Sequence, residues 1–378
     1  SLGHQVGDEL LKAVAIRLNA LVQPQDIVAR LGGDEFAVLR FIDPNAESTE
    51  QFAERIVAEF HQPLDISGRA ISISCSIGIA LYPLDGLTAI DLLKHADRAT
   101  YAAKEIGRNT YHFYDAAMQK EADRFVLLHH EILKGLELNQ FFLVYQPIYD
   151  VNSGKFTKCE ALVRWQHPER GLISPLDFIA VAERTGAIRP LGHFVLKQAL
   201  ADSQLFRRQG LELQISINRS SQEFNVHHVA QEWLQSIQQA GLEYNSIIFE
   251  ITESLFMDRI SVQQNNIMAL HSEGVQLAID DFGTGYSALN YLSRYPVNFI
   301  KIDKSFVNDV DEQERARALV AVLINMAKVL DVQVVAEGVE TAGQLAVLQE
   351  LGCDFIQGYY FSKPLKMDEF VKFLQQKV

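Results

Sequence analysis

The sequence predicts an α/β protein with two domains, the larger of which is a (β/α)₈ barrel of TIM-like architecture. The chain has 378 residues, more than one ordinary hydrophobic core organises, and this length predicts two domains of unequal size. From residue 141 onward, strand-like and helix-like segments alternate, and eight strands with intervening helices match the size and rhythm of such a barrel. Polar residues also recur where these strands end.

The first domain, residues 1–115, has helices and short strands in mixed order. Apolar spacing predicts helices at residues 9–22, 47–60 and 87–106, and strands at residues 27–31, 37–39, 71–80 and 111–114. The first two strands are separated by a glycine-containing turn, so they form a hairpin that carries Asp34 and Glu35 at its tip.

Residues 115–138 form one continuous predicted helix, and residues 116–123 within it are assigned to a helical linker between the domains. A helical linker transmits rotation, which a flexible Gly/Ser linker does not. The same pattern also fits a helix that simply packs as the last helix of one domain and the first of the next. The sequence leaves both interpretations open.

The second domain, residues 124–378, contains the elements of the predicted barrel. Strands are expected at residues 141–148, 158–165, 213–218, 247–251, 275–281, 299–303, 332–337 and 355–360. Helices fit between most of them, at residues 176–183, 192–209, 226–240, 260–272, 314–330 and 344–351.

Polar residues lie in or at the end of seven of these eight strands. In chain order they are Glu160, Asn218, Glu250, Asp280 with Asp281, Lys301 with Asp303, Glu337 and Gln357. Each alone could be a cap or turn residue. The active sites of such barrels lie at the carboxyl ends of the strands, so these side chains are expected to converge. Acids, an amide and one lysine at one point indicate a metal-assisted hydrolase.

The stretch 275–289 shows this pattern most clearly. A short apolar strand ends on Asp280 and Asp281, and a turn containing Gly283 and Gly285 follows. Two buried carboxylates need neutralising, and a divalent cation does this well because it prefers hard oxygen ligands. Taken alone, the stretch equally fits a solvated Asp-Asp turn that ends a strand and caps a helix.

Composition restricts the partners and the compartment. The formal net charge of −14 argues against binding a nucleic-acid polymer or an anionic membrane surface, but it leaves a small phosphate ligand possible beside bound metal. The three cysteines form no paired motif, which predicts a reducing, cytoplasmic setting. The chain starts as if within a domain, so we expect a fragment whose full-length form could carry a sensor or a membrane anchor.

Three motifs in the first domain resemble the GGDEF family, the diguanylate cyclases. They are Gly3-His4 with Gly7-Asp8, the segment RLGGDEF at residues 30–36, and YAAK at residues 101–104 with Gly107-Arg108-Asn109. The resemblance implies a truncated α/β domain with a central, mainly antiparallel sheet. It also implies a GTP site made of Asp8, Gly32, Gly33, Asp34, Glu35, Lys104 and Arg108.

Two departures from that family concern activity. The family's first strand carries a metal-binding Asp and a guanine-binding Asn, and both would lie before Ser1. The family's inhibitory product site has the pattern RxxD, whereas this chain has Gln23-Pro24-Gln25-Asp26. We therefore interpret the domain as a folded regulator of its neighbour, with cyclase activity in a bifunctional full-length enzyme as the alternative.

The second domain resembles the EAL family, the cyclic di-GMP-specific phosphodiesterases, over about residues 124–378. The motifs are EAL at residues 160–162 with Arg164, INRS at 217–220, EITES at 250–254, the segment 280–289, KID at 301–303, AEGVE at 336–340 and QGY at 357–359. The resemblance implies hydrolysis of cyclic di-GMP to linear pGpG and a homodimer formed through the barrel. The alternative is a receptor that binds cyclic di-GMP without cleaving it.

The resemblance also implies two Mg²⁺ or Mn²⁺ ions and a role for each motif residue. One ion is held by Glu160, Asn218, Glu250 and Asp280, and the second by Asp280, Asp281 and Glu337. Lys301 or Glu337 assists the attacking water, and both assignments stay open. Arg164, Gln146 and Gln357 contact substrate, and Asp303 belongs to the catalytic group. Glu253 holds the 281–289 loop. Glu340 is assigned to the substrate site, where it supports Glu337, or it caps the following helix.

Overall fold

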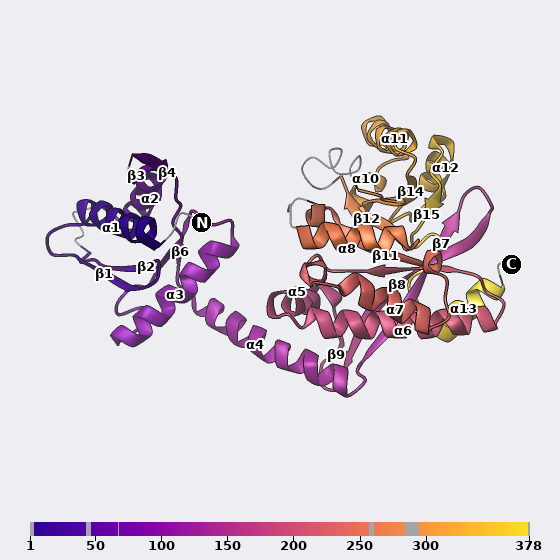
Figure 1. Ribbon diagram of the computed structural model, residues 1–378, viewed down its shortest axis with the longest axis horizontal. Coiled ribbons are helices and arrows are strands. Elements are labelled where there is room, and N and C mark those ends of the chain that lie inside the picture. Colours follow the sequence, from indigo (N-terminus) through magenta and orange to yellow (C-terminus); the bar gives the residue numbers. More distant parts are fainter. Residues whose placement is uncertain (1–3, 43–46, 67, 257–260, 284–294, 377–378) are drawn as a thin grey trace. The chain divides into compact units, whose positions relative to one another are not determined.

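The computed structural model describes residues 4–42, 47–66, 68–256, 261–283 and 295–376. The chain divides into two compact units, Ser1–Phe125 and Val126–Val378, and each is described by itself. Helix α4 (Ala116–Glu137) crosses the division, as the continuous predicted helix required (Figure 1).

The first unit contains three long helices and six short strands in its described part. The helices are α1 (His4–Leu21), α2 (Thr49–Phe60) and α3 (Ala89–Glu105). The strands are β1 (Ile27–Gly32), β2 (Glu35–Leu39), β3 (Leu64–Ile66), β4 (Arg69–Ile71), β5 (Ile77–Ile79) and β6 (Tyr111–Phe113). They pair two by two: β1–β2 and β3–β4 are antiparallel, and β5–β6 is parallel.

The predicted strand at residues 71–80 is wrong in its middle. Ile71 ends β4, only Ile77–Ile79 continues as a strand, and residues 72–76 have no ladder partner among the described strands. Alternating apolar residues therefore did not suffice, because a strand also needs a paired backbone. The core of this unit gathers Leu18 from α1 with Phe52, Ile56 and Phe60 from α2.

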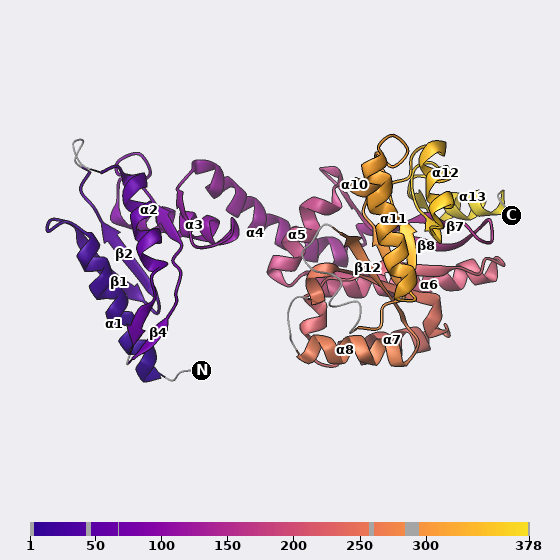
Figure 2. The same cartoon turned by 90° about the horizontal axis from the view of Figure 1, so that it is seen from above.

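The second unit is a closed barrel of eight strands with helices outside it (Figure 1, Figure 2). Its ring consists of β7 (Phe141–Asp150), β8 (Lys155–His167), β10 (Gln214–Asn218), β11 (Ile247–Thr252), β12 (Gln276–Phe282), β13 (Phe299–Ile302), β14 (Gln333–Ala336) and β15 (Phe355–Ile356). The short strands β9 (Gly171–Ile173) and β16 (Leu365–Lys366) pair with β8 and β7.

Six helices outside the ring lie close to their predicted positions. They are α5 (Pro175–Thr185), α6 (Ile188–Arg208), α7 (Val229–Gln239), α8 (Ser261–Ser272), α11 (Glu314–Val329) and α12 (Ala342–Leu351). A further helix, α13 (Met367–Gln375), was not among the predicted helices. Short helical turns also occur: η1 (Glu223–Asn225), η2 (Tyr244–Ser246), η3 (Glu253–Phe256) and α10 (Lys304–Val307). Both predicted fold features, the barrel and the α/β domain before it, are confirmed.

One strand differs from a uniformly parallel barrel: β7 runs antiparallel to both neighbours, β8 and β15. The cause is local, because residues 151–154 form a tight turn instead of a helix. Asp150 Oδ1 accepts hydrogen bonds from the backbone N–H groups of Asn152 and Ser153, and Gly154 has φ +70°. A hairpin connection makes its two strands antiparallel.

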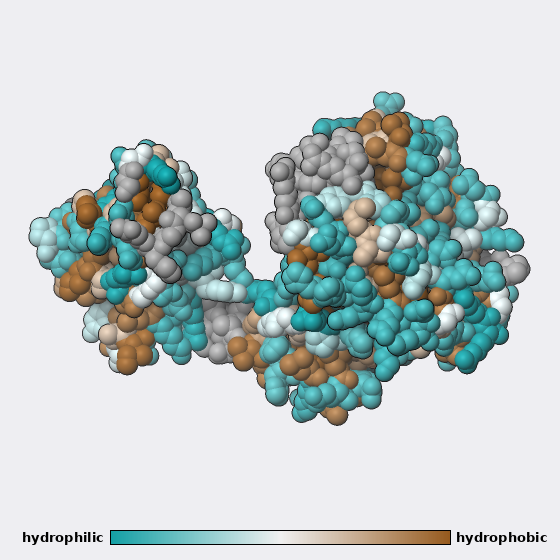
Figure 3. Space-filling view, viewed as in Figure 1, coloured by the Kyte–Doolittle hydropathy of each residue, from teal (hydrophilic) through white to brown (hydrophobic). Residues whose placement is uncertain are grey.

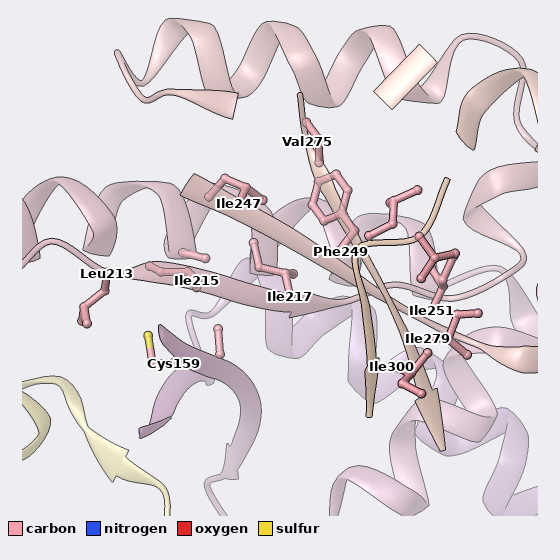
Figure 4. Packing of buried hydrophobic residues seen from close by; sticks show 14 of the residues in the cluster. Cys159, Leu213, Ile215, Ile217, Ile247, Phe249, Ile251, Val275, Ile279 and Ile300 are labelled. Atoms are coloured by element: carbon pink, nitrogen blue, oxygen red, sulfur yellow. The ribbon is translucent and has the colours of Figure 1, made fainter. Parts of the chain in front are cut away.

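The barrel strands separate two apolar layers. Side chains pointing outward pack under the helices, for example Ile215 and Ile217 of β10 and Ile247, Phe249 and Ile251 of β11 (Figure 4). Side chains pointing inward form a second cluster, made of Ile148, Ile248, Ala278, Phe299, Val335 and Phe355. Since successive side chains of a strand alternate between its faces, the residues two positions away from this cluster also point inward.

Candidate metal centre at the barrel rim

The predicted site residues form a polar layer beside the inner apolar layer. Glu250, Asp280, Lys301, Glu337 and Gln357 each follow a member of the inward cluster by two residues, and Gln146 precedes Ile148 by two. Glu160 and Asn218 similarly follow Lys158 and Ser216, which are the buried polar residues of the inner layer on β8 and β10. The strand alternation thus brings together residues that are up to about two hundred positions apart in the chain.

Three amide side chains and Glu160 form a hydrogen-bond chain across the barrel. Asn218 Nδ2 donates to Glu160 Oε1 over 2.6 Å, and Gln357 Nε2 donates to Glu160 Oε2 over 2.6 Å. Gln357 Nε2 also donates to Gln146 Oε1 over 3.1 Å. These bonds fix the carboxylate of Glu160 and turn the carbonyl oxygen of Asn218 away from it.

Lys301 is 1 % exposed and lies among four carboxylates. Its Nζ is 2.6 Å from Glu337, 2.7 Å from Glu250, 3.1 Å from Asp280 and 3.6 Å from Glu160. Burying an ammonium group is costly unless opposite charges surround it, and here they do. Although burial opposes the charge, the four acids hold the pKa of Lys301 well above its ordinary value.

The same crowding shifts the acids. Burial and the neighbouring carboxylates raise the pKa of Glu250 well above its ordinary value, and burial raises the pKa of Glu337 to about 7. Burial opposes ionisation of Glu160 as well, but Lys301 and the amides of Gln357 and Asn218 together lower its pKa. These acids repel one another, so a bound cation would stabilise their charged forms.

Asp281 joins the cluster because the strand is irregular at this point. In a regular strand its side chain would face away from that of Asp280. The pairing of β12 with β13 shifts register between Ile279 and Phe282, and Asp281 has φ +53°. Ligand oxygens of Asp280, Asp281 and Glu337 consequently lie within 4.8 Å of one another. Burial and the charge of Asp280 raise the pKa of Asp281.

The donor set fits divalent metal ions. Five carboxylates and the one ammonium of Lys301 leave a formal charge of −4, which is the charge that two divalent cations neutralise. All these donors are hard oxygens, the ligand type that Mg²⁺ and Mn²⁺ prefer. The side chains therefore make a candidate metal centre, as the strand ends predicted.

The remaining predicted residues have other partners. Arg164 Nη1 donates to the carbonyl of Val163 over 2.8 Å, and burial lowers the pKa of this guanidinium. Asp303 is the N-cap of α10 and accepts a hydrogen bond from the backbone N–H of Ser305 over 3.0 Å. Glu340 forms an exposed ion pair of 2.5 Å with Lys304.

Glu340 and Glu253 differ from the other predicted residues in what the structure says of them. The N-cap of α12 is Thr341, so the alternative that Glu340 caps this helix is wrong; Thr341 supplies the hydroxyl oxygen that the cap requires. Glu253 is buried and neither of its carboxylate oxygens has a hydrogen-bond partner among the described residues. Glu253 is predicted to hold the 281–289 loop, but residues 284–289 of that loop lie outside the described part of the chain, so this contact stays a prediction.

In the first unit, the predicted nucleotide residues lie on three elements: the β1–β2 hairpin, α1 and the end of α3. Gly32, Gly33, Asp34 and Glu35 form the exposed tip of the β1–β2 hairpin, where Gly33 has φ +49°. Arg30 closes this turn by donating from Nη2 to the Gly33 carbonyl over 2.6 Å. Asp8 is exposed on α1, and Lys104 and Arg108 are exposed at the end of α3.

Sequence reasoning missed Lys158 and Ser216, the polar residues beneath Glu160 and Asn218. Lys158 is buried over the rings of Phe299 and Phe355, at 5.0 and 4.4 Å from their centroids. The signal that could have found both is their spacing of two residues before a predicted ligand.

A polar ring of this kind at one rim of a (β/α)₈ barrel is typical of the class of barrel hydrolases that use metal ions. The family models identify which one: the EAL domain model matches residues 129–364, and the model of the diguanylate cyclase GGDEF domain matches residues 1–110. The chain belongs to the EAL family, in a tandem arrangement with a GGDEF domain. The predicted boundaries of the first domain (1–115), the linker (116–123) and the second domain (124–378) stay predictions.

Named relatives match nearly the whole of this chain. The chain is 38 % identical over 370 residues to the bifunctional diguanylate cyclase/cyclic di-GMP phosphodiesterase MucR of Pseudomonas aeruginosa, covering 98 % of this chain and 54 % of MucR. It is 37 % identical over 376 residues to the cyclic di-GMP phosphodiesterase NbdA of the same organism, covering 99 % of this chain and 48 % of NbdA. The chain spans about half the length of the curated relatives it matches.

A solved structure supports the same family. The MucR phosphodiesterase in complex with cyclic di-GMP is 35 % identical, with a TM-score of 0.61, and the match covers 65 % of this chain and 99 % of that chain. Separately, none of the helices in the described residues is both long enough and apolar enough to cross a membrane.

Proposed function

We propose that the barrel hydrolyses cyclic di-GMP to linear pGpG with two Mg²⁺ or Mn²⁺ ions. The observation that carries this proposal is the inward ring of Glu160, Asn218, Glu250, Asp280 and Glu337, with Asp281 added by the irregular strand. The name of NbdA and the cyclic di-GMP complex of MucR give the substrate class. A receptor without activity is less well supported, because the chain retains all the proposed ligands.

The proposed ligands divide as the sequence suggests. Glu160, Asn218, Glu250 and Asp280 would hold one ion, and Asp280, Asp281 and Glu337 the other. When bound, the ions would supply Lewis acidity that lowers the pKa of water and neutralises charge on phosphate. The hydrogen bonds from Asn218 and Gln357 would keep Glu160 oriented, as partners of metal ligands commonly do.

The other side chains would act on water and substrate. Lys301 Nζ, buried among carboxylates, would orient the attacking water and stabilise developing negative charge. Glu337, whose carboxylate lies 2.6 Å from Lys301 Nζ, is the alternative group to assist that water, by accepting its proton. Arg164 would present its planar guanidinium to a phosphate. Gln146, Gln357 and Glu340 would contact the substrate, and Asp303 would belong to the catalytic group.

The first unit would act as a GTP-binding regulator through Asp8, Gly32, Gly33, Asp34, Glu35, Lys104 and Arg108. The alternative is a bifunctional enzyme with cyclase activity in its full-length form, for which the name of MucR is the supporting observation.

We also propose a homodimer through the barrel. One candidate surface is α11, where the exposed Leu319, Val322 and Val329 lie on one helical face. Figure 3 shows hydrophobic residues gathered on the surface near this helix.

The proposal is tested by incubating the purified 378-residue chain with cyclic di-GMP and Mg²⁺ or Mn²⁺ and separating the products. We expect linear pGpG in the reactions that contain metal and none in reactions that contain a chelator. Parallel reactions contain GTP, with an Asp34→Ala/Glu35→Ala variant as control, so that an effect at the first unit is seen separately. If no pGpG forms with Mg²⁺ and none forms with Mn²⁺, the phosphodiesterase proposal is refuted.

A further inference from the structure

Arg219 is a buried arginine that directly follows the proposed ligand Asn218. Its side chain is 0 % exposed. Nη1 donates to the carbonyl of Gly192 over 2.9 Å and to Glu223 Oε1 over 3.1 Å. The guanidinium also lies over two ring faces, 4.1 Å from the Trp233 centroid and 5.1 Å from that of Phe249. One side chain therefore touches α6, η1, α7 and β11.

This arrangement compensates the cost of burying the charge. Glu223 supplies the opposite charge, and its second oxygen accepts the backbone N–H of Ser220 over 3.1 Å. Nε and Nη2 of Arg219 have no hydrogen-bond partner among the described residues, so the aromatic faces are the groups that interact with them. The packing is also close: a Cβ on Gly192 would lie 2.2 Å from Glu223 Oε1 and 2.8 Å from Arg219 Nη1.

The backbone of Arg219 is connected to two proposed metal ligands: it follows Asn218 in the chain and is hydrogen-bonded to the backbone of Glu250. Asn218 pairs with Glu250 in the β10–β11 ladder, and the next N–H, that of Arg219, donates to the Glu250 carbonyl over 2.8 Å. This bond extends the ladder beyond the end of β10 (Gln214–Asn218). The position of the Asn218 side chain thus depends on where the residue that follows it is held.

Asn218 itself has few constraints. Its side chain is exposed, and within the described part of the chain its amide group donates a hydrogen bond to Glu160. A carboxamide at the end of a strand would otherwise move with the loop that follows. The buried Arg219, by contrast, is held from three sides.

We propose that Arg219 is a positioning residue for the metal centre. By anchoring the end of β10 to α6 and η1, it holds the Asn218 carboxamide beside Glu160, among the proposed metal ligands. This inference rests on the proposed function only in taking Asn218 as a metal ligand. It predicts that the Arg219–Glu223 pair sets metal affinity, although neither side chain reaches the metal centre.

The test measures Mn²⁺ binding by electron paramagnetic resonance and calorimetry, without substrate. The principal variant is Arg219→Met/Glu223→Met, because replacing a buried ion pair with apolar residues of similar volume commonly preserves stability. We expect a melting temperature close to that of the wild type and Mn²⁺ binding weakened about tenfold or more. Arg219→Lys, which keeps the charge but lacks the planar guanidinium that lies over Trp233 and Phe249, should also weaken binding.

A double-mutant cycle separates positioning from general loosening. In an Asn218→Ala background, the Arg219→Met/Glu223→Met change should weaken Mn²⁺ binding by no more than about twofold, because the ligand that it positions is already absent. Tyr145→Phe, which removes a buried hydrogen bond to Asp202 in the same barrel, is the matched control and should leave Mn²⁺ affinity unchanged.

Two results would overturn the positioning role: wild-type Mn²⁺ affinity in both Arg219 variants, or fully additive losses with Asn218→Ala. Failure of the proposed function looks different. A wild-type chain that binds Mn²⁺ but yields no pGpG would refute the phosphodiesterase and leave the positioning result intact, whereas a wild-type chain that binds no Mn²⁺ would overturn both.

Discussion

The ammonium of Lys301 lies 2.6 Å from Oε1 of Glu337, a residue that follows the neighbouring strand. Lys301 pairs with Val335 in the β13–β14 ladder, and Glu337 is two residues further on, so both side chains point into the barrel. Lys301 is thereby the positive charge at the centre of the proposed metal ligands.

Lys301→Met should make the barrel depend on metal for stability. Without the ammonium, the buried carboxylates repel one another, and we expect a loss of roughly 3 kcal/mol in chelator. Mn²⁺ should restore much of this loss, so the metal-induced rise in melting temperature should exceed that of the wild type. Lys158→Met, at the other buried lysine of the barrel, is the control. If Mn²⁺ raised the melting temperature of the wild type and of Lys301→Met equally, Lys301 would not be the charge that compensates these carboxylates.

Glu160→Ala and Asp280→Asn should each abolish turnover of cyclic di-GMP. Each removes one anionic ligand from a site that must hold two dications, and a loss of at least about a hundredfold is expected. Substrate binding should persist in part through Arg164. Steady-state hydrolysis and equilibrium binding, measured on the same preparations, separate the two effects. Near-normal turnover by Asp280→Asn would exclude the two-metal proposal.

Asp281→Asn should lose activity while keeping the fold. Asparagine tolerates the left-handed conformation that Asp281 adopts at φ +53°, so the substitution removes charge without adding backbone strain. Asp331→Asn is the matched control, because Asp331 has φ +56° in an exposed turn outside the cluster. Thermal unfolding should be similar for both variants, and hydrolysis should fall only for Asp281→Asn. Equal activities would remove Asp281 from the site.

Calcium should inhibit hydrolysis that Mg²⁺ supports. Ca²⁺ accepts the same oxygen ligands but prefers longer bonds and more of them, so it would occupy the cluster of Asp280, Asp281 and Glu337 without the required geometry. Titrating Ca²⁺ into a Mg²⁺ reaction should lower the initial rate, and excess Mg²⁺ should restore it. Equal rates with Ca²⁺ and Mg²⁺ would show that our description of the site is wrong.

The first unit should lose stability in acid through Glu47. Its carboxylate accepts hydrogen bonds from Arg55 Nε over 2.9 Å and Nη2 over 2.8 Å, and these bonds lower the pKa of Glu47 from 4.5. A lowered folded-state pKa adds stability above the unfolded value, and this is lost as pH falls through the folded value. Glu47→Gln should therefore cost up to about 1 kcal/mol at pH 7 and less near pH 3.

Chemical denaturation of the first unit at both pH values measures this difference. Glu59→Gln is the control, because Glu59 lies 3.9 Å from Arg17, at the margin of an ion pair. A destabilisation by Glu47→Gln that is the same at both pH values would contradict the assignment.

The order of elements and the family could be predicted from the sequence, because they depend on local pattern. Alternating strand and helix segments predicted the barrel, and strand-end acids such as Glu250 and Asp280 predicted the rim at which acidic side chains converge. The GGDEF motif likewise predicted a hairpin whose tip carries Asp34 and Glu35.

Only the tertiary structure decided how these residues meet. The hairpin that reverses β7 places Gln146 opposite Glu160, and the register shift in β12 turns Asp281 to the same side as Asp280. Neither follows from a two-residue pattern, because each depends on backbone geometry and on hydrogen bonds to a neighbouring strand. Arg219 shows the same limit: its sequence position marks a strand end, but its burial among α6, η1 and two aromatic rings arises only when distant segments pack together.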